Sequence, residues 1–403
     1  CKEHPRPPGP ERAGDEHPPG GYLPQPAMKF IHPVHVLIVL LTGGVWWRSA
    51  ADWVKAWLFV HFQNGAALQG YCASVVKQEH TAGVGNKTWQ AQMAQKRLPW
   101  RITGAMRLYP DHRELQYSCT QALCSISLWN SDTSAVVAEA GGIEVLMGAA
   151  LGHPEDARLQ ARVTGSLGCL ADEVLANREA IVRAGGVQQG ISAWDRHLQD
   201  PGLLFGVCAL FAGISYESVP NKRAIIGVGF LPRALDRIKA FPESRAMVRE
   251  EVMQVFQGLA NRPPVQEIHD ELLRAGILEA TLTVLRENGE DAATVTNAVR
   301  VLMGLAERNA TQRTLLVQAG AIEVLVGQIG LNRGTGYAFY VDVDAVSVHA
   351  LWHIAMGDAD NQRAIVRAGG REKIQAVISE QPDNGYLRAV GAGALKELGA
   401  IEG

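Results

Sequence analysis

The residues with the clearest chemical potential are two histidines, His349 and His353, four positions apart in a stretch predicted to be helical. Residues four apart on a helix project from one face, so both imidazoles would point the same way, as two metal ligands do. No third His, Cys or carboxylate sits at a useful sequence spacing, so we expect no metal and no cofactor. The two histidines are better interpreted as polar surface contacts, with Trp352 between them packed in the core.

A second candidate is the segment TAGVGNKT at residues 81–88, in which glycines precede a Lys-Thr pair as in a phosphate-binding loop. That loop requires Gly directly before Lys, and Asn86 stands there instead. Asn86 and Asn309 each begin an Asn-x-Thr sequon, which matters only if the chain is secreted. No Ser-His-Asp or Cys-His arrangement can be proposed from the spacing. We therefore expect a protein that is not an enzyme.

Six cysteines are few for 403 residues, and four of them lie in apolar helical patterns where a free thiol behaves as a small hydrophobe. These four are Cys119, Cys124, Cys169 and Cys208. Because no Cys-x-x-Cys pair occurs, we expect buried thiols rather than disulfides or metal ligands, and a reducing, cytoplasmic location. The net charge of −3 gives no general attraction to nucleic acid, so no such partner is expected.

The chain divides into three regions by composition. Residues 1–27 are rich in proline and predict a disordered leader. Residues 28–100 stay unassigned, although an aliphatic run at 34–41 has the shape of a signal-peptide core and tryptophans follow it. That run is too short for an ordinary spanning helix. Membrane contact through residues 28–57, or entry into the secretory route, is one interpretation; a packing helix, or a stretch outside the natural fold, is the other.

Residues 101–403 repeat. Six corners of a small residue followed by glycine occur, with glycines separated by 44, 44, 47, 44 and 49 residues. These glycines are Gly141, Gly185, Gly229, Gly276, Gly320 and Gly369. An asparagine stands eight residues before three of them, at Asn177, Asn221 and Asn361. A glycine that follows the last turn of a helix accepts positive φ without a Cβ clash, so each corner predicts the end of a short first helix.

A second feature of each unit predicts a longer helix. Six aliphatic residues, here called anchors, each follow another mostly apolar position by eleven residues, which gives a helix of about three turns with one apolar face. The anchors are Ile126, Leu170, Ile214, Leu259, Leu305 and Ile354. A seventh copy starts at Leu387. Because no unit can bury its own apolar face, the units must stack, which predicts an all-α solenoid.

The segments NREAIVRAGGVQQGI from Asn177, NKRAIIGVGFLPRAL from Asn221 and NQRAIVRAGGREKI from Asn361 resemble armadillo repeats. The resemblance covers residues 101–403, as about six units plus partial terminal units. It implies a right-handed superhelix of three-helix repeats whose third helices line a concave groove for peptides or partner domains. Importin-alpha and catenin members hold peptides with a Trp and an Asn four residues apart, and no unit here keeps that pair. The array therefore looks closer to divergent armadillo scaffolds, including those fused to kinases.

The expected function is that of a scaffold or adaptor that binds partner proteins or extended peptides in this groove. The third-helix spacing of the family places the following residues in the groove: Tyr117, Gln121, Ser125, Phe205, Glu250, Gln254, Arg300, His349 and His353. The insertion YAFYVDVD at 337–344 either anchors a partner or packs on the adjacent unit. Two alternatives stay open: the regulatory arm of a larger enzyme, and a membrane-tethered armadillo adaptor.

Overall fold

The computed structural model describes residues 64–172, 174–240, 245–287, 291–307, 309–331 and 342–399. The predicted disordered leader and the signal-like segment with its tryptophans lie outside these ranges, and so do residues 337–341, which include the aromatic residues of the 337–344 insertion. Within them the chain forms helices and no strand. The all-α prediction is therefore confirmed for the described residues.

Twenty-one of the helices form seven consecutive triplets, and one further helix precedes them. The leading helix is α3 (Gly65–Ala82). The triplets are α4 (Lys87–Gln95), α5 (Leu98–Leu108), α6 (Arg113–Ser127); α7 (Ser131–Glu139), α8 (Gly142–Gly152), α9 (Ala157–Ala171); α10 (Leu175–Arg183), α11 (Gly186–Arg196), α12 (Pro201–Ser215); α13 (Val219–Gly227), α14 (Phe230–Ala240), α15 (Arg245–Ala260); α16 (Gln266–Arg274), α17 (Ile277–Glu287), α18 (Ala292–Ala306); α19 (Ala310–Gln318), α20 (Ala321–Gln328), α21 (Val343–Ala355); and α22 (Ala359–Arg367), α23 (Gly370–Glu380), α24 (Gly385–Gly399).

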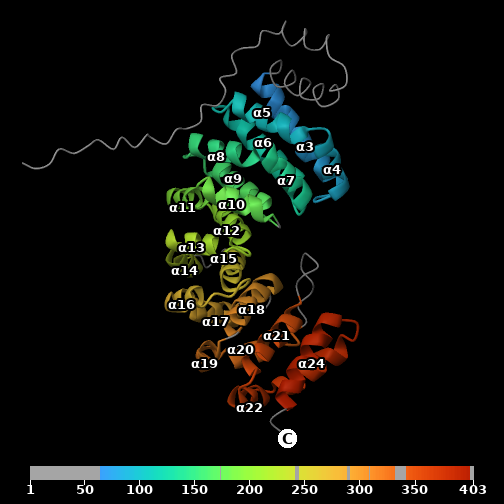
Figure 1. Ribbon diagram of the computed structural model, residues 1–403, viewed down its shortest axis with the longest axis vertical. Helices are drawn as coiled ribbons and strands as arrows, with labels where there is room; N and C mark the ends of the chain where they lie inside the picture. Colours follow the sequence, from blue (N-terminus) through green and yellow to red (C-terminus); the bar gives the residue numbers. More distant parts are fainter. Residues whose placement is uncertain are drawn as a thin grey trace, which may run out of the picture. The chain divides into compact units, whose positions relative to one another are not determined.

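The triplets follow one another in chain order (Figure 1). The third helix of each triplet packs against the third helix of the next, from α6 through α24, and α3 packs on α6 in the same manner. This is the predicted armadillo-type solenoid of stacked three-helix repeats. Residues 65–100, which the sequence alone left unassigned, form α3, α4 and the start of α5.

The corner between the first and second helix explains why the leading triplet escaped the sequence pattern. All six predicted corner glycines have positive φ, between 76° and 87°, so the prediction of a helix end is confirmed there. At the same corner of the leading triplet stands Arg97, with φ of 57°. A non-glycine residue is uncommon in this left-handed region. The glycine pattern of the sequence therefore does not include the α4–α5 turn.

In three of the units, the asparagine of the first helix donates a hydrogen bond to the anchor of the preceding third helix, which explains their spacing of seven residues. The buried Nδ2 of the asparagine donates to the anchor carbonyl, which lies in the last turn of the preceding third helix and has no partner within that helix. The distances are 2.8 Å for Asn177 to Leu170, 2.9 Å for Asn221 to Ile214 and 3.0 Å for Asn361 to Ile354. The residue after each asparagine donates a second hydrogen bond, to a backbone carbonyl near the end of a third helix.

In one unit that second donor is a buried lysine. Lys222 is fully buried in α13, and its ammonium donates to the carbonyls of Asn261 and Pro263, the latter at 3.1 Å. Burial lowers the pKa of Lys222 to about 8. Arg178 holds the same position in α10 and donates to the carbonyls of Ala171 and Tyr216 at 2.9 and 3.0 Å. These two cations therefore donate to backbone carbonyls at or just after the ends of third helices, in the same triplet and, for Arg178, also in the preceding one. Their role is structural.

The hydrophobic core is continuous from unit to unit. The ring of Phe230 in α14 meets Trp194 of α11, Phe211 of α12 and Phe256 of α15 edge to face, with centroids 5.7, 5.3 and 6.2 Å apart. Such pairs stabilise beyond the area they bury. One side chain thus joins two successive triplets, as expected for units that cannot bury their apolar faces alone.

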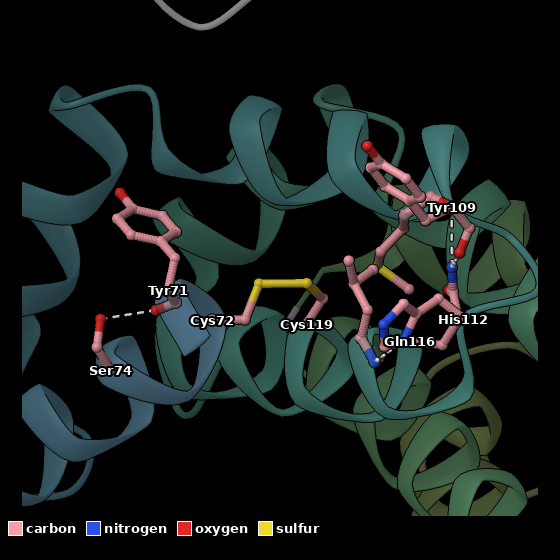
Figure 2. Close-up of a disulfide and its surroundings, with 9 residues drawn as sticks. Tyr71, Cys72, Ser74, Tyr109, His112, Gln116 and Cys119 are labelled. Carbon is pink, nitrogen blue, oxygen red and sulfur yellow. Dashed lines mark hydrogen bonds between the residues drawn. A yellow bond between two sulfur atoms is a disulfide. The ribbon is translucent and has the colours of Figure 1, made fainter. Parts of the chain in front are cut away.

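The expectation that Cys119 is a free buried thiol is wrong. Cys119 of α6 forms a disulfide with Cys72 of α3, across a sequence separation of 47 residues (Figure 2). The partner lies in the unassigned region, so the sequence pattern offered no reason to pair the two. Cys124, Cys169 and Cys208 are free thiols, and Cys208 is buried.

Among the helices described, none by itself is both long and apolar enough to cross a bilayer. Only α7 and α8 taken together, with a 68° bend at their junction, have the necessary length and composition.

Candidate partner-binding face of the third helices

The third helices share a partly exposed line of residues, five positions before each anchor and before Leu398 in α24. These residues are Gln121, Gly165, Ala209, Gln254, Arg300, His349 and Gly393, and all of them are at least partly exposed. Because consecutive third helices pack side by side, this line runs across α6, α9, α12, α15, α18, α21 and α24. We call the line and the exposed residues beside it the third-helix face.

At the N-terminal part of this face, two arginines of α9 stack on a tyrosine of α6. The guanidinium carbon of Arg158 lies 3.7 Å from the centre of the Tyr117 ring and that of Arg162 lies 5.6 Å from it. Arg162 Nη2 also donates to the Tyr117 hydroxyl at 3.4 Å. Burial raises the pKa of Tyr117, but hydrogen bonds from Arg162 and Arg158 outweigh it and leave that pKa lowered. We call these three residues the Tyr-Arg cluster.

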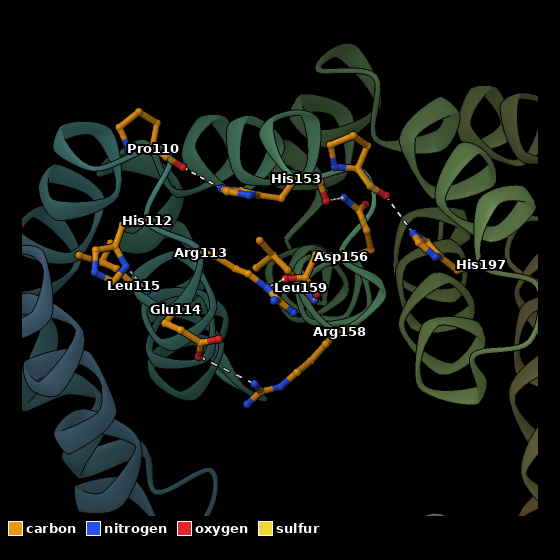
Figure 3. A network of polar contacts seen from close by, with 12 residues as sticks. Pro110, His112, Arg113, Glu114, Leu115, His153, Asp156, Arg158, Leu159 and His197 are labelled. Atoms are coloured by element: carbon orange, nitrogen blue, oxygen red, sulfur yellow. Dashed lines mark hydrogen bonds and ion pairs between the residues drawn. The ribbon is translucent and has the colours of Figure 1, made fainter.

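Ion pairs hold the edge of this cluster (Figure 3). Arg158 Nη1 lies 3.8 Å from Glu114 Oε2, and Arg113 pairs with Asp156 at the start of α9. Asp156 also accepts a hydrogen bond from the Leu159 amide at 3.1 Å as the cap of α9. Both pairs join α6 to the turn or helix that follows 43–44 residues later, so they connect neighbouring third helices. The exposed Arg158–Glu114 pair contributes little stability by itself.

The middle of the face is rich in glycine and alanine, and the structure gives a packing reason for part of this. A Cβ at Gly206 of α12 would lie 2.5 Å from the Ala161 carbonyl oxygen, and one at Gly168 of α9 would lie 2.9 Å from the Ala209 backbone. These glycines allow α9 and α12 to approach closely. Phe205 stands beside them and is 50% exposed, a large apolar side chain open to solvent.

Two adjacent glutamates lie on α15. Burial and the charge of Asp291 raise the pKa of the half-buried Glu250. Glu251 is only 7% exposed, and burial together with Glu250 raises its pKa to about 8. Gln254, one turn further on, is exposed. The predicted contact Glu250 is therefore partly exposed on α15, next to the buried Glu251.

At the C-terminal part of the face, two imidazoles and two aromatic rings gather on α21 and α24. The His349 ring lies 4.6 Å from that of His353, 5.7 Å from Trp352 and 6.1 Å from Tyr386, centre to centre. His349 Nδ1 is 2.8 Å from the Tyr386 hydroxyl. Burial, aided by His353, lowers the pKa of His349 to about 4, so this imidazole is neutral at pH 7. We call these four residues the His-aromatic cluster.

Burial also affects two more ionisable groups at this end of the face, His353 and Arg300. Burial lowers the pKa of His353, and its Nδ1 is buried without a hydrogen-bond partner among the described residues. Arg300 of α18 is half-buried, its pKa is lowered by burial, and its charge acts on Tyr386. Nowhere in the described ranges do three His, Cys, Asp or Glu residues gather as a metal site would require.

Of the nine residues predicted to contact a partner, eight are at least partly exposed on the third helices, and Ser125 is not. Ser125 is 6% exposed, so its side chain is not available to a partner. The sequence reasoning missed Arg158, Arg162 and Tyr386. Arg158 and Tyr386 share a signal, since both stand twelve residues before the closing aliphatic residue of their third helix, at Leu170 and Leu398.

The remaining sequence motifs form helix caps and turns. Asn86 and Asn309, the two sequon asparagines, cap α4 and α19 by accepting from backbone amides at 3.0 Å. The segment resembling a phosphate loop is thus the turn between α3 and α4. In the 337–344 insertion, Asp342 caps α21 and Asp344 accepts from the Gly330 amide at 2.8 Å.

The sequence matches no protein-family model and no curated protein. Solved structures do match. An engineered protein from a structural genomics consortium is similar with a TM-score of 0.70 and 19% identity, over 87% of this chain and 79% of that one. A designed armadillo repeat protein is similar with a TM-score of 0.53 and 20% identity, over 62% of this chain and 98% of that one.

A second designed armadillo repeat protein, solved in complex with the peptide (KR)4, is similar with a TM-score of 0.52 and 19% identity, over 62% of this chain and 98% of that one. At this level of identity the likeness concerns the fold. The stacked triplets, the glycine corners and these matches agree, and together they establish that the chain folds as an armadillo-like repeat scaffold.

Proposed function

We propose that this protein is a non-enzymatic scaffold that binds an extended segment of a partner protein along the third-helix face. One observation carries the proposal: the lining position stays at least partly exposed on seven consecutive third helices that pack side by side. A regular line of this kind fits an extended chain, because each stacked unit can meet the next few residues of the ligand.

The chemistry of the face favours a partner segment that carries carboxylates and apolar side chains. Arg158 and Arg162 present guanidinium donors suited to carboxylate oxygens. Arg300 adds a cation at the other end of the face. Phe205 and Tyr386, each 50% exposed, offer apolar contacts. The designed relative in complex with (KR)4 holds a basic peptide, so a different charge preference is proposed for this chain.

A peptide array tests this function with the full chain. Peptides of equal length and matched hydrophobicity carry acidic, neutral or basic residues, and the best binders are measured by fluorescence anisotropy. Arg158→Ala combined with Arg162→Ala should weaken binding of acidic peptides tenfold or more, since the loss of even one charge-assisted hydrogen bond costs about 1.5–3 kcal/mol. The matched control is Arg183→Ala, at an exposed arginine of α10 paired with Glu179. Equal binding of basic peptides, or an equal loss with the control, would contradict the proposal.

We propose a cytoplasmic location, on cysteine content alone. The Cys72–Cys119 disulfide opposes this proposal, because structural disulfides persist mainly in oxidising compartments. Rapid alkylation of thiols in intact cells, followed by mass spectrometry of the protein, decides the matter. A free Cys72 supports the cytoplasm, and a fully oxidised pair indicates the secretory route.

A further inference from the structure

Two of the three free thiols among the described residues lie on neighbouring third helices and interact with each other. Cys124 is on α6 and Cys169 is on α9, 45 residues later, and both are partly exposed. Close by, Ser166 Oγ of α9 donates to the Thr120 carbonyl of α6 at 3.2 Å, so the two helices are in contact one turn before the thiols. Neither cysteine has a part in the partner binding proposed above.

In the next layer of the solenoid, the equivalent pair of positions lies close together. Moving 44 residues along the repeat converts Cys124 and Cys169 into Gly168 and Gly213. A Cβ at Gly213 would lie 3.8 Å from the Gly168 Cα and 3.2 Å from its carbonyl oxygen. In the α6–α9 layer the two equivalent positions both carry sulfur, and the thiols of Cys124 and Cys169 are hydrogen-bonded to each other.

We propose that Cys124 and Cys169 form a reversible dithiol–disulfide site that reacts with hydrogen peroxide and links α6 to α9 covalently.

The surroundings assign different roles to the two thiols. A hydrogen bond from Cys169 and the charge of Arg162 lower the pKa of Cys124, whereas the Cys124 interaction and burial raise the pKa of Cys169. The thiolate is the nucleophile, and a nearby cation and donor increase its population. Cys124 is thus the attacking sulfur and Cys169 the resolving one.

The reaction balances in two steps. The Cys124 thiolate attacks one peroxide oxygen, the O–O bond breaks, and the departing hydroxide takes up a proton, which leaves a sulfenic acid and one water. The Cys169 thiol then attacks the sulfenic sulfur, the S–O bond breaks, and its proton leaves with the hydroxide as a second water. Two thiols lose two electrons in total, and one peroxide gains them.

Cys208 provides a matched control within the chain. It lies on α12, it is fully buried, and burial followed by the charge of Glu251 raises its pKa well above the ordinary thiol value. Such a thiol reacts slowly.

The test treats the full-length protein with a graded excess of hydrogen peroxide, blocks residual thiols by alkylation, and maps peptides without reduction. We expect a cross-linked peptide joining Cys124 to Cys169, with the loss of two hydrogen atoms in mass, which dithiothreitol reverses. Cys208→Ser should leave this product unchanged. Cys124→Ser should remove both the cross-link and the dimedone-reactive sulfenic acid, and Cys169→Ser should remove the cross-link while sulfenic acid accumulates.

The mapping of the wild-type protein decides the proposal even if a variant fails to fold. Oxidation of Cys124 to sulfinic acid without the cross-link, or oxidation of Cys208 at the same rate as Cys124, would overturn it.

Discussion

The two ends of the third-helix face use different chemistry. Around α6 and α9, the Tyr-Arg cluster is charged, ion pairs surround it, and a disulfide ties α6 to α3. Around α21 and α24, the His-aromatic cluster contains imidazoles with lowered pKa values, and no disulfide occurs among its described residues. The same repeat geometry thus supports a charged, covalently braced end and a largely neutral, noncovalent end. The solenoid therefore determines where residues lie on the face, whereas the individual side chains determine the charge and polarity of each end.

Removal of the disulfide should have the largest effect on the difference in stability between the two ends. Cys72→Ser leaves α3 held to α6 by noncovalent packing alone. For a bridge spanning 47 residues, the chain-entropy model gives a loss of roughly 4 kcal/mol for the unit it closes. Native-state hydrogen exchange should show faster exchange in α3–α6 and unchanged exchange in α21–α24. Uniform acceleration along the chain would mean that the bridge stabilises the whole array.

The layer between the two ends should respond to alkaline pH through Glu251. Its folded pKa of about 8 lies above the ordinary value of 4.5, so its stabilising contribution is complete below pH 4.5 and is lost as pH rises through 8. Glu251→Gln should therefore stabilise the protein at pH 8.5, by roughly 1–3 kcal/mol, and have little effect at pH 4.5. Urea unfolding at both pH values checks this. An equal effect at the two values would rule out titration as the cause.

The C-terminal end should respond to acid instead. The folded pKa of His349, about 4, lies below the ordinary 6.5, so its contribution is present above pH 6.5 and is lost as pH falls toward 4. His349→Gln should reduce the acid sensitivity of α21–α24 by roughly 1–2 kcal/mol, after allowance for partial exposure. Hydrogen exchange of those helices at pH 4.5 and 7 gives the measurement, and α6–α9 act as the internal reference.

Binding should distinguish the two ends by salt dependence. Arg300→Ala with His349→Ala should weaken partner capture roughly tenfold, about 1.4 kcal/mol, and should lower thermal stability by less than that. The wild-type contribution of the Tyr-Arg cluster should fall as salt rises, because salt screens exposed charges. The contribution of the neutral His349 to binding should not change with salt. An equal fall of stability and binding in the double variant would show that these residues are structural.

The smallest effect is expected at the leading corner. Arg97→Gly should stabilise the α4–α5 turn by about 1 kcal/mol, because glycine tolerates the positive φ that arginine adopts there. Gly369→Arg, at the matching corner of the last triplet, should destabilise by a similar amount. Thermal unfolding of both variants tests the pair, and a destabilising Arg97→Gly would show that the arginine side chain contributes contacts that outweigh its backbone cost.

The sequence by itself determined the repeat period, the helix ends at the corner glycines and the spacing of anchors and asparagines. These features depend on local backbone preference and on one hydrogen bond between residues seven apart, so they recur at fixed offsets. It also placed Tyr117, Arg300, His349 and His353 on the third helices, because the family's spacing applies to each helix separately.

Only the tertiary structure decided which side chains meet across units. Tyr117 and Arg162 are 45 residues apart, and Cys72 and Cys119 are 47 apart, so each contact depends on the register in which neighbouring third helices stack. That register is set by close approaches such as the one at Gly206, which involve the backbone of another unit. Burial then shifts the pKa values of Glu251 and His349, which sequence spacing does not report.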